Sequence, residues 1–299
     1  MSDPEATARA LLDRAHRRTL SLAERGIDVA LLDWGGDGPL ALLHHANGFC
    51  KGTWAEVADA LGRRFRVVAM DARGHGDSSQ PQGPHAYDWN HFAEDLVAVA
   101  EALVAERGGA PIALGMGHSF GGTAMIGAAA RRPDLFARLL LIDPVVPPPP
   151  SANITPETTP HLRKLVDGAR RRRGHWPSRA AARAYCHERK FFSSWRPTAI
   201  ELYLLDGMRE RPDGSLELKC KGAVEAAVFG SSSTIDLFAL AAQVTVPTDV
   251  MWAERGDFPR AVHAMLADTL RAGHVIEVSA GHLVPMEDPR LVLAAVENP

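Results

Sequence analysis

The sequence is poor in cysteine, aromatic residues and surplus charge. Three of its 299 residues are cysteine, aromatic residues make up 6%, and the formal net charge is -3 at pH 7. Cys50, Cys186 and Cys220 form no CxxC or zinc spacing, so we expect reduced thiols rather than disulfides or a metal centre. The small net charge gives no reason to expect nucleic acid or an anionic membrane surface as a partner.

Long hydrophobic runs are also missing. No stretch approaches the roughly 20 apolar residues that a membrane-spanning helix needs. The N-terminal stretch has no apolar core and carries Asp3, Glu5 and Asp13, which argues against a targeting peptide. We therefore expect a cytoplasmic protein without a membrane span, either a monomer or a homodimer. The remaining composition, 46% hydrophobic and 23% charged, is that of a globular protein.

Short apolar runs alternate with helical patterns along the chain. Most of these runs are continuously apolar, which is typical of strands buried on both faces. We expect strands at 18–22, 27–35, 39–46, 65–71, 110–117, 137–143, 247–253 and 273–280, and helices at 54–61, 89–106, 123–131, 258–270 and 289–296. The alternation predicts an α/β fold with a mainly parallel, twisted sheet and helices on both faces, preceded by an antiparallel hairpin.

A proline-rich stretch interrupts this alternation. Residues 144–150 read PVVPPPP and can form neither a helix nor an inner strand. We predict that residues 147–233 form an inserted helical cap and that residues 1–146 and 234–299 form the two parts of the core. Within the cap, the basic run 170–173 could bind an anion, but a solvated helix face is the favoured interpretation.

A serine stands at a predicted strand-to-helix turn in GMGHSFGG, residues 115–122. In a G-x-S-x-G sequence the glycines remove side chains that would collide at so sharp a bend, which presents the serine hydroxyl as a nucleophile. The helix that follows supplies free backbone N–H groups. We predict that Ser119 is the nucleophile and that the N–H of Phe120 binds the oxyanion.

A serine nucleophile needs a base and a carboxylate. His282 follows the last predicted strand in SAGHLVPMEDP and is the predicted base. The loop after the penultimate strand contains Asp257, our first choice for the acid, and Glu254. Asp143, at the end of LLLID, stays open as the alternative; we take the chain order of nucleophile, acid and histidine to favour Asp257.

The loop after the third predicted strand, LLHHANGFCKGTW, predicts the second oxyanion donor. By position we assign this role to the N–H of Asn47. Phe49 from the same loop is expected to line the substrate pocket, together with His118, Trp195 and Leu283. Further cap aromatics predict an apolar pocket roof: Trp176, Phe191, Phe192 and Phe229.

Other polar motifs do not predict a metal or cofactor site. MDARGHGDSS lacks the third glycine and the following helix of a dinucleotide loop, so we expect His75 and Asp77 to fix this loop by hydrogen bonds. The adjacent His44 and His45 would point to opposite faces of a strand and cannot bind one metal together. We expect neither a metal nor a cofactor.

The motifs HHANGF, DARGHGDSS, GHSFGG, ERGD and GHLVPMEDP follow one another as in the α/β-hydrolase superfamily, which the chain resembles over nearly its whole length. The resemblance implies the α/β-hydrolase fold with a lid over the site, Ser119 as nucleophile, His282 as base and an acid at Asp257. The usual His-Gly is His45-Ala46 here. Serine at the nucleophile position disfavours the epoxide hydrolases and haloalkane dehalogenases of the superfamily.

The expected activity is hydrolysis of small to medium acyl or aryl carboxylic esters through an acyl-enzyme. A lactonase, thioesterase, amidase, perhydrolase or carbon–carbon bond hydrolase would use the same residues and stays open. A ligand-binding protein that has lost turnover is a further alternative, although the predicted site residues are all present.

Overall fold

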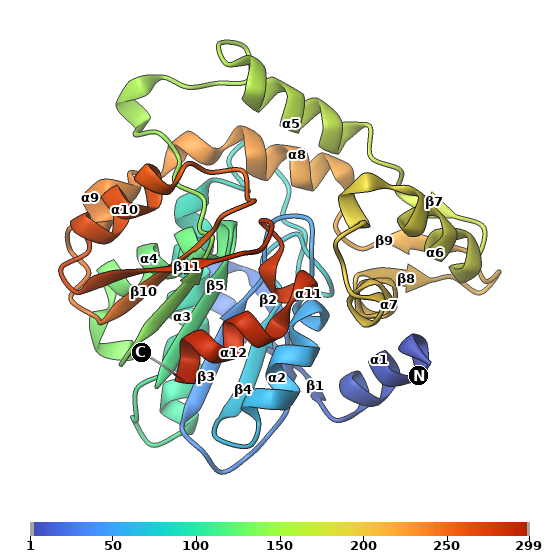
Figure 1. Ribbon diagram of the computed structural model, residues 1–299, viewed down its shortest axis with the longest axis horizontal. Helices are drawn as coiled ribbons and strands as arrows, with labels where there is room; N and C mark the ends of the chain where they lie inside the picture. The colour runs from blue at the N-terminus through green and yellow to red at the C-terminus, as the bar shows by residue number, and fades with distance from the viewer. Residues whose placement is uncertain (1–2, 298–299) are drawn as a thin grey trace.

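The computed structural model describes residues 3–297, which form an eight-stranded sheet with helices on both sides (Figure 1). The strand order is β1-β2-β4-β3-β5-β6-β10-β11. The bounds are β1 His16–Leu22, β2 Ile27–Asp33, β3 Leu40–His44, β4 Arg66–Met70, β5 Leu114–His118, β6 Leu139–Ile142, β10 Thr248–Ala253 and β11 Gly273–Val278. In this sheet β4, β3, β5, β6, β10 and β11 pair in parallel, β2 pairs antiparallel with β4, and β1 and β2 form the predicted antiparallel hairpin. The predicted fold class is therefore confirmed.

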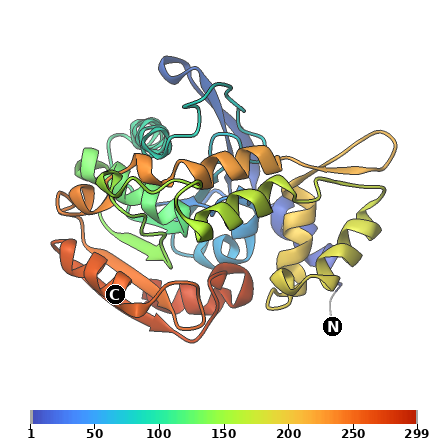
Figure 2. The same ribbon diagram turned by 90° about the horizontal axis from the view of Figure 1, so that it is seen from above.

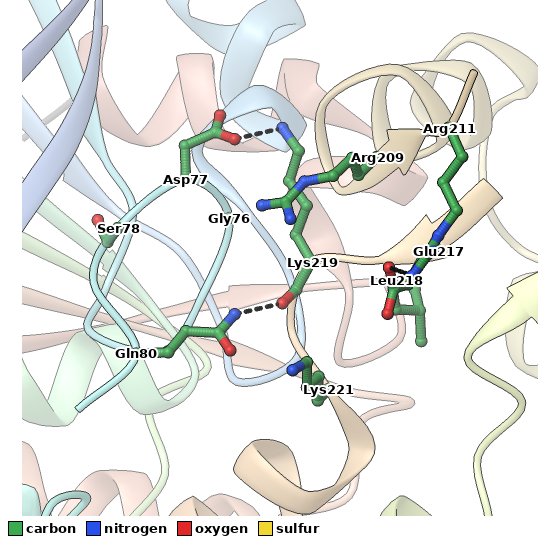
Figure 3. Close-up of a pocket in the computed structure, with 10 residues that line it drawn as sticks. All are labelled: Gly76, Asp77, Ser78, Gln80, Arg209, Arg211, Glu217, Leu218, Lys219 and Lys221. Atoms are coloured by element: carbon green, nitrogen blue, oxygen red, sulfur yellow. Dashed lines mark hydrogen bonds and ion pairs between the residues drawn. The ribbon is translucent and has the colours of Figure 1, made fainter. Parts of the chain in front are cut away.

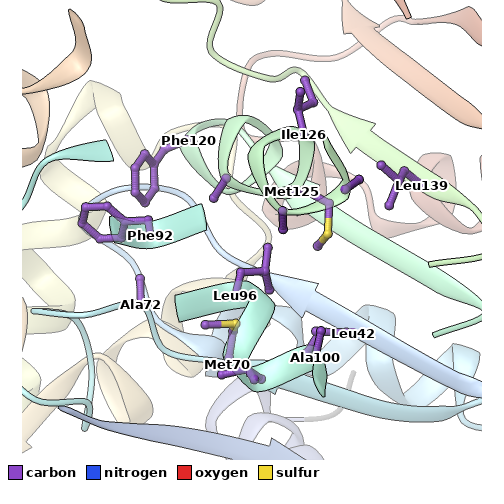
Figure 4. Close-up of a cluster of buried hydrophobic side chains, with 14 of the residues drawn as sticks. Leu42, Met70, Ala72, Phe92, Leu96, Ala100, Phe120, Met125, Ile126 and Leu139 are labelled. Atoms are coloured by element: carbon purple, nitrogen blue, oxygen red, sulfur yellow. The ribbon is translucent and has the colours of Figure 1, made fainter. Parts of the chain in front are cut away.

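The two faces of the sheet bury different side chains because successive residues of a strand alternate in direction. In β3, Leu40 and Leu42 belong to the core on one face, whereas Ala41 and Leu43 belong to the core on the other. Figure 4 shows part of the first core, in which Leu42 lies beneath side chains of two neighbouring helices. Burial on both faces explains why these strands read as continuous apolar runs.

Helices cover both faces of the sheet (Figure 2). The core on one face includes residues of α3, α4, α9 and α10, and the core on the other includes residues of α2 and α12. The bounds are α2 Ala55–Leu61, α3 Trp89–Glu106, α4 Phe120–Arg131, α9 Leu237–Ala241, α10 Arg260–Thr269, α11 Val284–Glu287 and α12 Pro289–Glu297. Short 3-10 turns lie at Ala23–Arg25, Lys51–Trp54, Pro133–Leu135, Pro150–Ala152, Lys190–Phe192 and Ser232–Thr234.

The segment 147–233 holds helices above and beside the sheet and a small sheet of its own (Figure 1). Its elements are α5 Pro160–Arg170, β7 His175–Trp176, α6 Arg179–Glu188, α7 Pro197–Asp206, β8 Met208–Glu210, β9 Leu216–Leu218 and α8 Gly222–Gly230. The helical pattern was predicted, but the sheet β7-β9-β8 was not. These strands are two or three residues long, which is too short for a period of two to be visible in the sequence.

The N-terminal helix α1, Pro4–Asp13, was also not predicted. The Asp3 side chain accepts a hydrogen bond from the Glu5 N–H and caps the helix. Proline occupies the first helical position, where its missing N–H costs nothing. Leu11 and Leu12 pack against Leu202 of α7. Between residues 3 and 297, no helix combines the length and apolarity needed to cross a bilayer.

A buried cluster of charged side chains joins the segment 147–233, whose role as a cap remains a prediction, to the rest of the chain. Lys51 is 1% exposed, and its Nζ lies 2.6 Å from Asp71 Oδ2, 2.9 Å from Asp77 Oδ2 and 3.4 Å from Asp206 Oδ2. Asp206, the last residue of α7, also accepts a hydrogen bond of 2.7 Å from Arg17 of β1. Despite desolvation, these carboxylates raise the pKa of Lys51 above its usual range, so the amine stays charged.

Candidate active site

Ser119 occupies a strained turn between β5 and α4. Its φ of 56° and ψ of −121° are rare for a residue with a side chain. A Cβ on Gly117 would lie 2.4 Å from the Gly121 oxygen, and one on Gly121 would lie 2.5 Å from the His44 oxygen. The glycines on either side of Ser119 are therefore required by the close approach of β3, β5 and α4, as the sequence predicted.

His282 connects Ser119 to Asp143. Its Nε2 lies 2.9 Å from Ser119 Oγ, and its Nδ1 lies 2.6 Å from Asp143 Oδ2. The loop that carries His282 follows β11 and is fixed by Glu287, which accepts the Gly281 N–H at 2.8 Å. An imidazole that donates from Nδ1 to a carboxylate presents its Nε2 lone pair to the serine hydroxyl. The arrangement is suited to removing the proton of Ser119.

The predicted Asp257 is not the carboxylate that contacts His282. Asp257 and Glu254 lie exposed between β10 and α10, whereas Asp143 is fully buried. Asp143 directly follows β6, the neighbour of β5 in the sheet, and this places it beside Ser119. Chain order does not distinguish the candidates, because Asp143 also lies between Ser119 and His282.

Asp143 is held by several groups that the sequence did not indicate. Its Oδ1 accepts the Ala253 N–H at 3.1 Å and lies 3.5 Å from Nε2 of His263, a fully buried residue of α10. His263 Nε2 also lies 3.2 Å from the Pro144 oxygen. Burial lowers the pKa of His263, so it is neutral near pH 7 and can donate from Nε2 to the Pro144 oxygen beside Asp143. No motif surrounds His263 in the sequence that could have revealed this contact.

His118, predicted to line the pocket, packs against His282, and its contact with a substrate remains a prediction. The two rings are 5.3 Å apart, and His118 Nε2 lies 2.9 Å from the His282 carbonyl oxygen. Burial, and then the neighbouring His282, lower the pKa of His118 to about 3. A neutral His118 can donate this hydrogen bond and so fixes the backbone beside the imidazole that contacts Ser119.

The two predicted oxyanion donors lie on neighbouring elements. Phe120 begins α4, where the first backbone N–H groups have no partner within the helix. Asn47 lies in the loop after β3, which pairs with β5 directly below Ser119. The predicted fixing of loop 70–79 by His75 is confirmed, because its Nε2 accepts the Gly48 N–H of the Asn47 loop at 3.0 Å and its Nδ1 lies 2.9 Å from the Arg73 oxygen. Asp77 also forms a hydrogen bond, as predicted, because its Oδ2 accepts from Lys51 Nζ at 2.9 Å.

Cap residues hold the loop of Asn47 from above. The Asn47 side chain donates to the backbone oxygen of Glu225 in α8 at 3.1 Å. Arg172 lies 2.5 Å from the Glu225 carboxylate and donates to the Tyr203 hydroxyl. The favoured interpretation of the basic run 170–173 as a solvated helix face is therefore wrong for Arg172. A Cβ on Gly48, whose φ is 81°, would lie 2.8 Å from Glu225 Oε1.

The other predicted pocket residues lie in one buried apolar cluster. Phe49, Trp195 and Leu283 are 5–7% exposed and pack together with Trp176 and Phe192 of the cap. The rings of Phe49 and Trp195 are 5.4 Å apart. This cluster joins the loop after β3, the cap and the loop of His282, and contact of its members with a substrate remains a prediction.

Comparison with curated proteins finds relatives over part of the chain. A segment of 125 residues is 39% identical to a bifunctional esterase/perhydrolase of Acinetobacter calcoaceticus and covers 41% of this chain and 43% of that protein. A segment of 108 residues is 34% identical to a 2-(acetamidomethylene)succinate hydrolase of Mesorhizobium japonicum and covers 36% of each. The chain thus spans less than half the length of these curated relatives.

Solved structures match over nearly the whole chain. The crystal structure of E-2-(acetamidomethylene)succinate hydrolase superposes with a TM-score of 0.77 at 24% identity and covers 95% of this chain and 98% of its own. At these identities the likeness shows the fold. The model of the Alpha/beta hydrolase family matches residues 41–296, which include the β3 loop, the serine turn and the histidine loop. The chain belongs to the alpha/beta hydrolase family.

Proposed function

We propose that the protein is a serine hydrolase of carboxylic esters that works through an acyl-enzyme. The observation that carries the proposal is the continuous contact from Ser119 Oγ to His282 Nε2, at 2.9 Å, and from His282 Nδ1 to Asp143 Oδ2, at 2.6 Å. A serine hydroxyl needs such a base, and the base needs a carboxylate that fixes its tautomer.

In the first half-reaction, His282 Nε2 takes the hydroxyl proton while Ser119 Oγ bonds to the acyl carbon. The oxyanion of the tetrahedral intermediate is stabilised by the N–H groups of Phe120 and Asn47. Asp143 stabilises the imidazolium, which then gives its proton to the departing alcohol. In the second half-reaction, water repeats these steps and releases the carboxylic acid. The chemistry needs neither a metal nor a cofactor.

An uncharged ester is the favoured substrate class. The Acinetobacter relative is named a bifunctional esterase/perhydrolase. The aromatic cluster around Phe49 and Trp195 would suit a small to medium acyl or aryl group. Arg172 borders the loop of Asn47 at Gly48, but its charge is balanced by Glu225. A balanced cation gives little attraction for an anionic substrate.

The experiment is hydrolysis of p-nitrophenyl esters from acetate to laurate by the wild type and by Ser119→Ala. Ser193→Ala, at an exposed hydroxyl in the cap, serves as the matched control. We expect loss of at least about 10³-fold in kcat/KM for Ser119→Ala and none for the control. A fluorophosphonate should add one adduct to the wild type and none to Ser119→Ala.

Unchanged hydrolysis by Ser119→Ala would refute the mechanism. Labelling of Ser119 without ester turnover would support Ser119 as the nucleophile and favour a lactonase, thioesterase, amidase, perhydrolase or carbon–carbon bond hydrolase. The absence of both labelling and turnover would favour a ligand-binding protein. A cytoplasmic location and a monomeric or homodimeric state remain predictions.

A further inference from the structure

A polar cavity of about 340 Å³ lies between the core loop 76–80 and the hairpin β8–β9 of the cap (Figure 3). It contains none of the residues of the candidate active site. Four cationic and two acidic side chains line it. The lining residues are Gly76, Asp77, Ser78, Gln80, Arg209, Arg211, Glu217, Leu218, Lys219 and Lys221.

The carboxylate of Asp77 is already neutralised by lysines. Its Oδ1 lies 2.8 Å from Lys219 Nζ, and its Oδ2 lies 2.9 Å from the buried Lys51 Nζ. Although burial opposes it, these two amines lower the pKa of Asp77. The negative charge of Asp77 is therefore already balanced by these two lysines and does not balance the other cations of the cavity.

Three cations surround the second acid, Glu217. Arg211 lies 2.5 Å from its carboxylate, and the charges of Lys221 and Arg209 also lower its pKa. Within residues 3–297, neither Arg209 nor Lys221 has an ion-pair partner within 4 Å. In Figure 3, Arg209 extends from β8 toward the core loop. Two positive charges at the cavity thus remain unbalanced.

We propose that this cavity binds a small molecule that bears a phosphate group. A phosphate monoester carries about −1.5 to −2 charges near pH 7, which matches the two unbalanced cations. An arginine fork binds phosphate oxygens through two parallel hydrogen bonds, and lysine adds a point charge. The volume lies at the lower end of the range for small-molecule sites and leaves room for an organic group beside the phosphate.

A ligand in this cavity would contact both the core and the cap. The loop 76–80 belongs to the core, whereas Arg209 and Lys221 belong to the cap. Lys221 directly precedes α8, whose Glu225 oxygen holds the Asn47 side chain. Binding should therefore stabilise the cap hairpin against the core.

The test is calorimetric titration of the full chain with inorganic pyrophosphate at constant ionic strength. The variant R209Q/K221Q removes the two unbalanced charges, and R63Q/R271Q removes two exposed charges elsewhere as a control. We expect one site in the wild type and the control, and at least roughly tenfold weaker binding in R209Q/K221Q. Ser119→Ala should bind like the wild type, so failure of the proposed hydrolase activity is distinguishable from failure of this site.

R209Q/K221Q and R63Q/R271Q should both give the circular dichroism spectrum and urea unfolding midpoint of the wild type, which shows that they fold. Equal pyrophosphate binding by R209Q/K221Q and the wild type would refute the location. Tighter binding of citrate than of pyrophosphate would refute the phosphate class. Absence of pyrophosphate binding by the wild type at millimolar concentration would refute the site.

Discussion

Replacing Asp143 by asparagine separates the two candidate acids. Asparagine keeps an oxygen for the Ala253 N–H, now 3.1 Å from Oδ1, and would then turn its amide N–H₂ toward His282. His282 Nδ1 would become the acceptor and Nε2 would carry the proton, so Nε2 could no longer accept from Ser119 Oγ. The corresponding change in a serine protease triad lowers kcat about 10⁴-fold, or about 5.5 kcal/mol of transition-state stabilisation.

The assay is kcat/KM for a p-nitrophenyl ester, with Asp257→Asn as the matched control. We expect a loss of about 10³- to 10⁴-fold for Asp143→Asn and less than about twofold for Asp257→Asn, because Asp257 is exposed and Asp143 is fully buried at 2.6 Å from His282. Circular dichroism shows whether Asp143→Asn is folded. A folded, active Asp143→Asn combined with an inactive Asp257→Asn would refute the assignment.

Three further predictions concern the oxyanion loop, the serine turn and pH. Asn47→Ala removes the hydrogen bond to Glu225, worth about 1 kcal/mol, and should lower kcat about fivefold with little change in KM; an unchanged kcat would contradict a role for the cap contact. Gly121→Ala places a Cβ 2.5 Å from a backbone oxygen of β3 and should cost about 1–3 kcal/mol of stability, measured by urea unfolding; a wild-type midpoint would show that the turn relaxes freely. Burial lowers the pKa of His75 to about 4 and that of His118 to about 3, so the folded state binds fewer protons than the unfolded state below about pH 6.5. As the pH falls from there to about 4, each histidine should reduce the free energy of unfolding by about 1.4 kcal/mol per pH unit. Equal urea unfolding midpoints at pH 6.5 and pH 5 would refute this.

The parts of the fold and site that lie in short sequence patterns could be predicted. Continuous apolar strands and a helix-sized spacing gave the parallel sheet, and helix α3 has the predicted bounds 89–106. Ser119 was recognisable because its turn requires glycines within two residues on either side. His282 was recognisable because its loop directly follows the last strand.

The carboxylate that contacts His282 depends on which strands are neighbours in the sheet, and no local sequence pattern indicates the order of the strands. Asp143 and Asp257 both follow parallel strands, and only the order β5-β6-β10 shows which carboxylate approaches the imidazole. Similarly, the run 170–173 reads as uniformly basic, whereas Arg172 alone turns inward to Glu225. That contact joins residues 53 positions apart, so no helical or strand period could indicate it.

The charged cluster around Lys51 has a consequence for substrate entry. Lifting the end of α7 away from the core would separate Lys51 from Asp206 and leave a buried charge without one of its partners. Breaking a buried ion pair in this way costs about 3–5 kcal/mol, so the population with α7 detached should be very small. Helix α5 has no residue in this cluster. We therefore expect any opening of the segment 147–233 to leave the end of α7 in contact with the core.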